Sequence, residues 1–194
     1  MRSPGKEISS IPGRDRTLLE AAGKIRLIAL DVDGVLTDGR ITYSSSGDEI
    51  KSFNVRDGHA VKLALRAGLV VAIITGRESP IVLRRAEELG IFRVYQGALD
   101  KMETLGELLA DTGLDPVQTA YMGDDVVDLP VMKAVGLGCA PSDADPEVLA
   151  RADLVTGASG GKGAVRELIT FILSAQGLWE EVMARYLDQG EGSC

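Results

Sequence analysis

The stretch that decides the fold is residues 25–34, IRLIALDVDG, where a mostly apolar run stops at Asp31 and Asp33. A short apolar run of this kind is typical of a buried strand. Residues two apart on a strand point the same way, so the two carboxylates are expected to converge on one spot. They would repel each other there unless they shared a cation or a proton. A solvated acidic turn is the alternative, but we interpret the pair as part of a site, because acidic groups after a buried strand are costly unless used.

Outward from this strand, apolar runs alternate with helical patterns. Strands are predicted at residues 69–75, 92–95, 119–122, 136–139 and 154–156, and helices at 16–22, 57–66, 80–89, 101–112, 126–134, 146–150 and 164–176. Ser79 and Asp145 precede Pro80 and Pro146 and are candidate N-caps. The alternation predicts an α/β fold, a doubly wound parallel sheet with helices on both faces. Ligands bind beyond the carboxyl ends of the strands in such sheets.

Other segments do not follow the alternation. Residues 40–43 and 49–53 flank SSSGD, which predicts a β-hairpin (39–53) projecting over the same end of the sheet as Asp31. Residues 1–15 are rich in Gly, Pro and Ser and are expected to form a flexible arm before a core spanning 16–176. Residues 177–194 are expected to hold a last helix at 178–187 and a frayed end from Gly190.

Composition narrows the class of protein. A chain of 194 residues, 45 % hydrophobic and 26 % charged, fits one globular domain. The net charge of −8 disfavours nucleic acid as a partner, because binding its phosphates needs clustered Lys and Arg. Cys139 and Cys194 lack metal-ligand spacing. We see no signal-peptide pattern and no apolar run near the ~18 residues of a membrane span, so we expect a cytoplasmic protein without a membrane partner.

Two further candidate groups lie later in the chain, one at the end of a predicted strand and one at the start of a predicted helix. Thr75-Gly76-Arg77 follows a predicted strand, and a hydroxyl with free backbone N–H groups at a helix start is typical of an anion site. Taken alone, the same residues could form an ordinary loop. Lys101 begins a predicted helix, where an isolated lysine is usually a solvated charge.

The last cluster is acidic. Asp124, Asp125 and Asp128 follow the predicted strand 119–122, near the start of a helix. Helix capping is one interpretation, since the helix dipole favours acidic residues there. Asp124, directly at the strand end, is better explained as a ligand of a hard cation such as Mg²⁺.

Together the clusters describe a phosphoryl-transfer site, in which carboxylates hold a metal while Thr and Lys bind a phosphoryl group. In order and spacing, Asp31-x-Asp33, Thr75, Lys101 and Asp124-Asp125 closely resemble the four motifs of the haloacid dehalogenase superfamily, over residues 25–176. The resemblance implies a Rossmann-like core, with Asp31 as the nucleophile that forms an aspartyl-phosphate. It implies that Asp33 acts as general acid and then as general base.

The resemblance assigns the remaining roles as well. Mg²⁺ would be held by Asp31, the backbone carbonyl of Asp33 and Asp124. The phosphoryl oxygens would be bound by the Thr75 hydroxyl, the Gly76 N–H and Lys101. Asp125 and Asp128 would orient waters or Lys101 from behind these groups.

Further segments indicate a narrower family. LTDG at 36–39, FNVRDG at 53–58, ITGR at 74–77, YQG at 95–97, GDD at 123–125 and GGKGAVRE at 160–167 resemble the phosphatases of 3-deoxy-D-manno-octulosonate 8-phosphate (KDO 8-phosphate). The resemblance implies hydrolysis of a phosphorylated sugar acid to the sugar acid and phosphate. His59 and Ala60 depart from the family pattern, in which an aromatic or small residue and a glycine are common. His59 has no Ser or Cys partner for a triad, so we assign it to packing or an interface.

The intervals between the motifs leave no room for a separate cap domain, so the site is expected to be capless. The family covers its open site by forming a homotetramer, in which the hairpin of one subunit abuts the site of its neighbour. Ile41, Tyr43, Ile50 and Phe53 on the hairpin would otherwise form an exposed apolar patch. We therefore predict a homotetramer.

Arginines are the candidates to hold the carboxylate of a sugar acid. Arg77 is adjacent to the phosphate loop, Arg85 lies two turns along the next helix, and Arg56 is on the hairpin side and could act from a neighbouring subunit. Arg85 could instead form a surface ion pair with Glu87 or Glu88. An arginine at position 77, often acidic in related phosphatases of nine-carbon sugar acids, favours the eight-carbon substrate by resemblance.

Other functions are kept as alternatives. A phosphatase for a related nine-carbon sugar acid phosphate, or for small phosphomonoesters broadly, would use the same chemistry. A signalling receiver domain also uses aspartates, Thr and Lys at strand ends. The Asp-x-Asp-Gly after the first strand, with a further Gly-Asp-Asp after a later one, counts against it. A non-catalytic regulatory module is a third hypothesis, disfavoured because no motif residue is missing.

Overall fold

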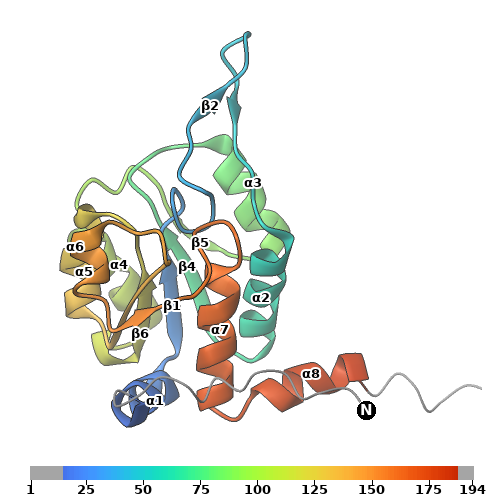
Figure 1. The fold of residues 1–194 in the computed structure, drawn as a ribbon, viewed down its shortest axis with the longest axis vertical. Helices are drawn as coiled ribbons and strands as arrows, with labels where there is room; N and C mark the ends of the chain where they lie inside the picture. The colour runs from blue at the N-terminus through green and yellow to red at the C-terminus, as the bar shows by residue number, and fades with distance from the viewer. Residues whose placement is uncertain (1–14, 188–194) are drawn as a thin grey trace, which may run out of the picture.

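The fold is a single parallel sheet with helices on both faces (Figure 1), seen in a computed structural model that describes residues 15–187. Its strands lie in the order β5-β4-β1-β6-β7-β8, and every neighbouring pair is parallel. The strand bounds are β1 Leu27–Leu30, β4 Val70–Ile74, β5 Arg93–Tyr95, β6 Thr119–Met122, β7 Leu137–Ala140 and β8 Leu154–Val155. Each predicted strand is present, and the doubly wound α/β class is confirmed.

Strand β1 is central, and this position explains its sequence. It pairs with Val70–Ile73 of β4 on one side and with Thr119–Met122 of β6 on the other, and its four residues are all buried. Strands covered on both faces need side chains that are apolar throughout rather than alternating. The carboxyl ends of β1, β4 and β6 therefore meet at one edge of the sheet, where the polar clusters follow.

The helices form two layers. Their bounds are α1 Asp15–Lys24, α2 Val55–Arg66, α3 Pro80–Leu89, α4 Lys101–Thr112, α5 Leu129–Ala134, α6 Pro146–Leu149, α7 Ala164–Ala175 and α8 Trp179–Leu187, with 3-10 turns η1 Pro116–Gln118 and η2 Val126–Asp128. One core cluster joins the sheet to α1, α2, α3 and α7, and a second joins its other face to α4, α5 and α6. The side chains of β6 alternate between the two faces of the sheet, since Met122 belongs to the first cluster and Tyr121 to the second.

Two local predictions need correction. The helix predicted at 126–134 is divided, because residues 126–128 form a 3-10 turn before α5 begins at Leu129. Asp145 caps α6 as predicted, accepting a hydrogen bond from the Glu147 N–H at 2.7 Å. Ser79 occupies the N-cap position of α3 without capping it, because its hydroxyl donates to Glu49 Oε2 at 2.6 Å instead.

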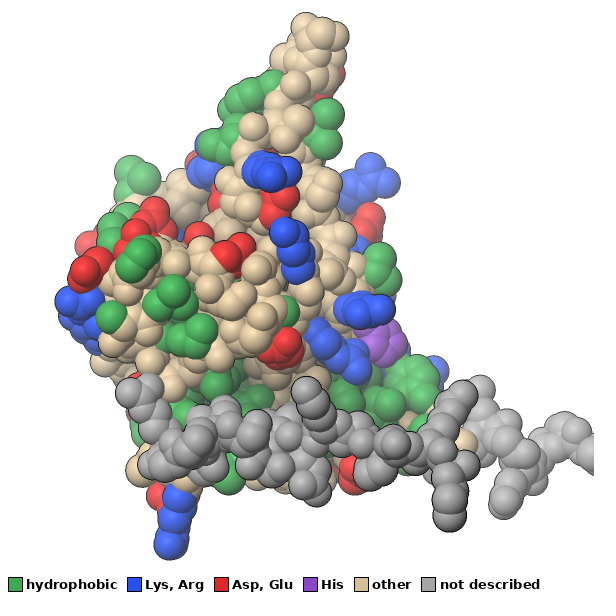
Figure 2. All heavy atoms as spheres, viewed as in Figure 1, with side chains coloured by type: hydrophobic (Ala, Val, Ile, Leu, Met, Phe, Trp, Pro, Cys, Tyr) green, Lys and Arg blue, Asp and Glu red, His purple; other side chains and the backbone are tan. Residues whose placement is uncertain are grey.

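The hairpin projects from the carboxyl end of the sheet (Figure 1), with shorter strands than predicted, β2 Thr42–Tyr43 and β3 Glu49–Ile50. Ile41, Tyr43 and Ile50 are 52 %, 61 % and 49 % exposed, and apolar side chains are visible along the hairpin in Figure 2. Phe53 was expected in this patch, but it packs against the core beneath the Arg85 guanidinium, 5.7 Å from the ring centroid.

The ends of the chain are described only in part. The expected flexible arm (1–15) lies outside the described residues except for Asp15, which begins α1, and so do Gly190 and Cys194 at the expected frayed end. Helix α8 contacts the core through Trp179, whose ring lies 5.2 Å from the Arg166 guanidinium. His59 packs against α8 as well, with 5.5 Å between its ring centroid and that of Tyr186. Among residues 15–187, no helix is long and apolar enough to cross a membrane.

Candidate active site

Three carboxylates gather at the edge of the sheet. Asp31 follows β1, Asp124 follows β6 and Asp128 ends η2, and each offers an oxygen within 4.8 Å of the others. Asp31 and Asp128 are buried, and Asp124 is half-buried. The proximity of Asp31 and Asp124 is the direct result of the parallel pairing between β1 and β6.

Lys101 supplies the compensating charge. It is the first residue of α4, and its buried ammonium lies 3.2 Å from Asp31 Oδ1 and 2.6 Å from Asp128 Oδ1. Burial alone would lower the pKa of Lys101, but attraction to the two carboxylates raises it above its ordinary value. Lys101 is therefore a fixed cation of the cluster rather than a solvated helix-start charge.

Asp128 organises the surroundings of this lysine. One of its oxygens accepts from Lys101 and from the Tyr121 hydroxyl, both at 2.6 Å. The other accepts from the backbone N–H of Asp124 at 3.0 Å and of Asp125 at 3.2 Å. Asp125 was expected behind the site with Asp128, but it is exposed, and its carboxylate accepts from the Val126 N–H at the start of η2. Sequence reasoning missed Tyr121. Its hydroxyl could have indicated the contact, because a tyrosine inside a buried apolar strand needs a buried hydrogen-bond partner.

The electrostatics of the cluster favour a cation. Burial raises the pKa of Asp31 to about 6, with Lys101 opposing the rise and Asp128 adding to it. Burial and then repulsion from Asp31 and Asp128 raise the pKa of Asp124 to about 7. Asp124 Oδ1 is also buried, and it has no hydrogen-bond partner among residues 15–187. Oxygen donors of this kind are the ligands that Mg²⁺ prefers, so the residues present fit such an ion.

Thr75 and Gly76 follow β4, beside β1. Thr75 is buried; its backbone N–H donates to the Tyr95 carbonyl at 2.9 Å, and its carbonyl accepts from the Ala98 N–H at 3.0 Å. These bonds fix the turn that carries the hydroxyl and the Gly76 N–H. The loop after β4 is therefore held against the loop after β5.

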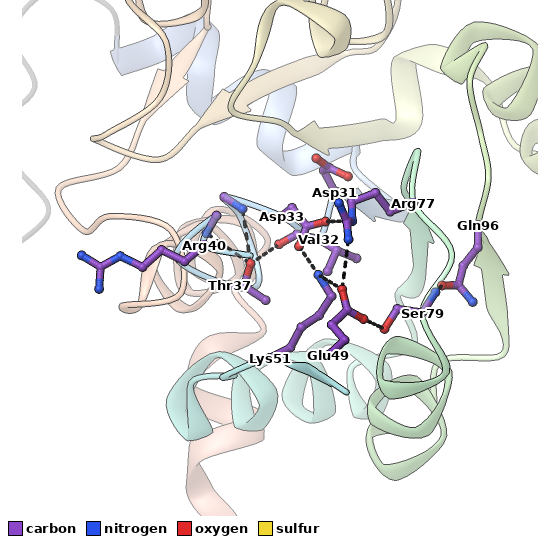
Figure 3. A network of polar contacts seen from close by, with 12 residues as sticks. Asp31, Val32, Asp33, Thr37, Arg40, Glu49, Lys51, Arg77, Ser79 and Gln96 are labelled. Carbon is purple, nitrogen blue, oxygen red and sulfur yellow. Dashed lines mark hydrogen bonds and ion pairs between the residues drawn. The ribbon is translucent and has the colours of Figure 1, made fainter. Parts of the chain in front are cut away.

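The Asp33 side chain takes a different direction from that of Asp31. It forms ion pairs with Lys51 of the hairpin and, at 3.6 Å, with Arg77 Nε (Figure 3). Asp31 pairs with Lys101 instead, so the two carboxylates have different partners, and their convergence on one substrate stays a prediction. The strand ends at Leu30, and the Thr37 N–H donates to the Val32 carbonyl at 3.0 Å, so the chain turns and strand alternation no longer applies.

Lys51 and Glu49 are the residues near the site that sequence reasoning missed. Both lie on one face of the hairpin base, two residues apart, while Ile50 between them is exposed. Their side chains face Asp33 and Arg77, and Glu49 Oε1 lies 3.2 Å from Arg77 Nη2 (Figure 3). The sequence did contain a signal for them, because charged and apolar residues alternate at Glu49, Ile50 and Lys51. In this hairpin the charged face is the one turned toward the site.

Two glycines allow the loops of the site to touch. A Cβ at Gly34, where φ is +91°, would lie 1.9 Å from Asp124 Oδ2. A Cβ at Gly160 would lie 1.7 Å from the Gly34 carbonyl oxygen. Buried Asp57 fixes the start of α7 beyond this loop, accepting from the N–H groups of Gly163 at 3.1 Å and Arg166 at 2.8 Å. The late loop at 157–163 therefore supports the loop of the predicted nucleophile.

The three candidate arginines are separated. Arg77 is in the Asp33 network, whereas Arg85 forms an ion pair with Glu88 at 3.2 Å, the alternative considered from the sequence. Arg56 is exposed in the first turn of α2. The structure of one chain brings only Arg77 to the carboxylate groups.

Comparisons with known proteins agree with this geometry. The sequence profile of the haloacid dehalogenase-like hydrolases matches residues 88–168. The 3-deoxy-D-manno-octulosonate 8-phosphate phosphatase of Salmonella typhi is 44 % identical over 182 residues, which are 93 % of this chain and 97 % of that protein.

Solved structures extend the comparison. The crystal structure of the corresponding phosphatase from Yersinia pestis has a TM-score of 0.84 and 46 % identity, covering 85 % of this chain and 89 % of that one. The enzyme from Moraxella catarrhalis, solved with magnesium, phosphate and KDO, has a TM-score of 0.85 and 40 % identity, covering 87 % and 97 %. The chain therefore belongs to the haloacid dehalogenase-like hydrolases and, within them, to the family of the 3-deoxy-D-manno-octulosonate 8-phosphate phosphatases.

Proposed function

We propose that the protein hydrolyses KDO 8-phosphate to KDO and inorganic phosphate through an aspartyl-phosphate on Asp31. The observation that carries the proposal is the buried Asp31 carboxylate, held 3.2 Å from Lys101 and beside Asp124 at the carboxyl edge of the sheet. The relatives named above carry this phosphatase activity in their names, over nearly the whole chain.

Each residue is proposed to have the role that the family resemblance implies. An Asp31 oxygen attacks phosphorus while the ester bond to the sugar oxygen breaks, and Asp33 gives that oxygen its proton. In the second half, Asp33 takes a proton from water as the water oxygen attacks phosphorus, which releases phosphate and restores Asp31. Lys101 and the loop of Thr75 and Gly76 bind the phosphoryl oxygens, and Asp128 keeps Lys101 in place.

Mg²⁺ is the proposed cofactor. Asp31, the Asp33 carbonyl and Asp124 would hold it, and the bound ion would neutralise charge on the phosphoryl oxygens. The buried, unpaired Asp124 Oδ1 and the carboxylates within 4.8 Å support this assignment.

Phosphate release from a panel of sugar and sugar-acid phosphates, with Mg²⁺ and with chelator, tests the activity. Release from KDO 8-phosphate is expected to need the metal and to be lost in Asp31→Asn, because an amide cannot attack phosphorus. Release only from nine-carbon or other phosphates would retain the mechanism and change the substrate. A long-lived phospho-protein without release would favour the receiver-like alternative, and no reaction at all would favour a binding module.

Arginines are proposed to hold the sugar-acid carboxylate, first Arg77 and then Arg85 and Arg56. Arg77 is supported by its place beside Asp33, and the other two would need a different subunit arrangement to reach a substrate. Arg77→Ala and Arg85→Ala are each expected to raise KM for KDO 8-phosphate. Arg84→Ala is the matched control, because Arg84 is exposed and its ion pair among residues 15–187 is with Glu88 on the same helix. An unchanged KM in Arg77→Ala would remove that residue from substrate binding.

A homotetramer and a cytoplasmic location complete the proposal. The tetramer is supported by the exposed Ile41, Tyr43 and Ile50 on a projecting hairpin over an uncapped site. The location is supported by a free, buried Cys139, which is typical of reducing compartments.

A further inference from the structure

Lys51 is a buried ammonium at the base of the hairpin. Its side chain is 2 % exposed, and it forms ion pairs with Asp33 Oδ1 and, at 3.5 Å, with Glu49 Oε1. Removing an ammonium from water is costly unless partners of opposite charge replace the water. A buried positive charge, that of Lys51, is therefore paired with Asp33, the carboxylate proposed to transfer protons.

Glu49 anchors this lysine to the opposite wall of the site. Its Oε1 lies 3.2 Å from Arg77 Nη2, and its Oε2 accepts from the Ser79 hydroxyl at 2.6 Å. The Ser79 N–H in turn donates to Gln96 Oε1 at 2.6 Å. Figure 3 shows this line of contacts running from Asp33 through Lys51 and Glu49 to the start of α3. The hairpin base is thus tied to the loops that follow both β4 and β5.

The two oxygens of Asp33 have different surroundings. Lys51 donates a hydrogen bond to Oδ1, whereas Arg77 Nε lies 3.6 Å from Oδ2 and makes no hydrogen bond. Within residues 15–187, no hydrogen bond to Oδ2 is formed. A carboxylate held by one oxygen keeps the other for proton transfer to a leaving group or from water.

We propose that Lys51 is a positioning residue that fixes Asp33 Oδ1, so that Oδ2 is the oxygen that transfers the proton, and that Glu49 holds Lys51 in place. The inference rests on the proposed phosphatase mechanism and adds the residue that aims its acid. It differs from a purely structural ion pair in one consequence. Only the two proton transfers, to the leaving oxygen and from the attacking water, should depend on Lys51, whereas the attack of Asp31 on phosphorus should not.

Leaving-group dependence separates the two roles. An alkyl phosphate such as KDO 8-phosphate needs a proton on its leaving oxygen, whereas p-nitrophenolate leaves without one. In Lys51→Met, single-turnover cleavage of the alkyl ester is expected to fall roughly 100-fold, within the range of general acid catalysis. The burst of p-nitrophenol from p-nitrophenyl phosphate is expected to change less than about 5-fold, because acid catalysis is not used there.

Two comparisons sharpen the test. Asp33→Asn should show the same dependence on leaving group, and the double variant should be little slower than Asp33→Asn alone, because both remove one function. Lys62→Met, an exposed lysine on α2, is the matched control and should match the wild type with both substrates. The Mg²⁺ concentration for half-maximal rate should stay the same in Lys51→Met.

The results that would overturn the proposal are equal losses with the two substrates, or no loss with either. If circular dichroism shows Lys51→Met unfolded, Glu49→Gln is measured in the same way, and the alkyl ester should again suffer the larger loss. Equal losses there would also overturn the proposal. Failure of the proposed function is distinguishable, because the wild type would then release neither phosphate nor p-nitrophenol.

Discussion

The Lys101 ammonium pairs with Asp31 and Asp128, and Asp124 offers an oxygen within 4.8 Å of those two carboxylates, so this largely buried site holds more acidic groups than basic ones. The neighbourhood of these four residues followed from sequence reasoning, because it needs only parallel strands that end at one edge. The direction of Asp33 did not follow, because it depends on Lys51, and Lys51 reaches the site only through the docking of the hairpin. A contact between two elements that are far apart in the chain leaves no local pattern in the sequence from which it could be predicted.

The raised pKa values give the metal-free protein a distinctive pH dependence. The pKa values of Asp31 and Asp124 are about 6 and about 7 in the folded chain, against 3.8 ordinarily, so the folded state binds more protons between about pH 4 and 7. The two groups therefore favour folding at low pH, and their contribution is lost as the pH rises through 6 and 7. Thermal melts in chelator should show this loss between pH 5 and 8.

Asp124→Asn is the control for this prediction, because it removes one of the two titrating groups. The fall in melting temperature from pH 5 to 8 should be shallower in the variant than in the wild type. Mg²⁺ binds the deprotonated carboxylates of the folded chain, so its stabilising effect should be larger at pH 8 than at pH 5. A slope that is the same in the two proteins would contradict the assignment of the raised pKa values.

Gly160 gives a second prediction at the scale of single residues. Gly160→Ala would place a Cβ 1.7 Å from the Gly34 carbonyl oxygen, so the backbone beside Asp31 must move. We expect a loss of unfolding free energy of about 1–3 kcal/mol. Phosphatase activity should fall as well. Gly106→Ala is the matched control, since a Cβ in that turn of α4 meets nothing within 4 Å, and it should stabilise the protein by about 0.5–1 kcal/mol. Urea unfolding measures both, and equal effects would contradict the packing argument.

Among the elements, helices and strands matched their predictions wherever a local pattern set them. The strand runs at 119–122 and 154–156 appear as β6 and β8, and the Pro80 helix ends at Leu89 as predicted. The helix at 126–134 did not, because Asp128 turns inward to Lys101 and Tyr121 and the first turn tightens around it. A residue with a partner elsewhere in the fold changed the local geometry.

One carboxylate fixes the first turn of α7 against α2, beside the apolar packing of the two helices, and its loss should be large. Asp57→Ala would leave the part-buried N–H groups of Gly163 and Arg166 without their acceptor, at a cost of roughly 2 kcal/mol. Asp57→Asn keeps one acceptor oxygen and should cost less. Urea denaturation of the two variants gives the comparison, and equal unfolding free energies for Asp57→Ala and wild type would contradict this role for Asp57.

For the whole molecule, the sequence predicted the layers and the projecting hairpin but left the order of strands open. The alternation of elements shows that strands are parallel, whereas the order β5-β4-β1-β6-β7-β8 depends on which way each crossover turns. The interval lengths predicted that no cap domain is inserted between the motifs, and the described residues 15–187 agree with this. The assembly stays a prediction, since it concerns contacts between chains.

The exposed hairpin provides the test of that prediction. Ile41→Glu with Ile50→Glu places charges in the proposed interface, so light scattering should show the proposed tetramer dissociating into smaller species. Circular dichroism should be unchanged, because both side chains are about half exposed in the single chain. Leu187→Glu, at an exposed site on α8, is a control for added charge. A wild-type protein that is monomeric would disprove the tetramer.

The central position of β1 has a consequence for the order in which the chain is made. Ribosomes deliver Leu27–Leu30 first among the strands of the sheet, yet its neighbour β6 is complete only about 90 residues later. At about 5–20 residues per second, that interval is roughly 5 to 20 s. During translation this fully buried strand must therefore wait with one edge unpaired, and the nucleophile after it has no Asp124 beside it. An unfinished chain is consequently inactive and prone to aggregation. The emerging polypeptide, rather than the finished enzyme, is therefore the form most in need of chaperones.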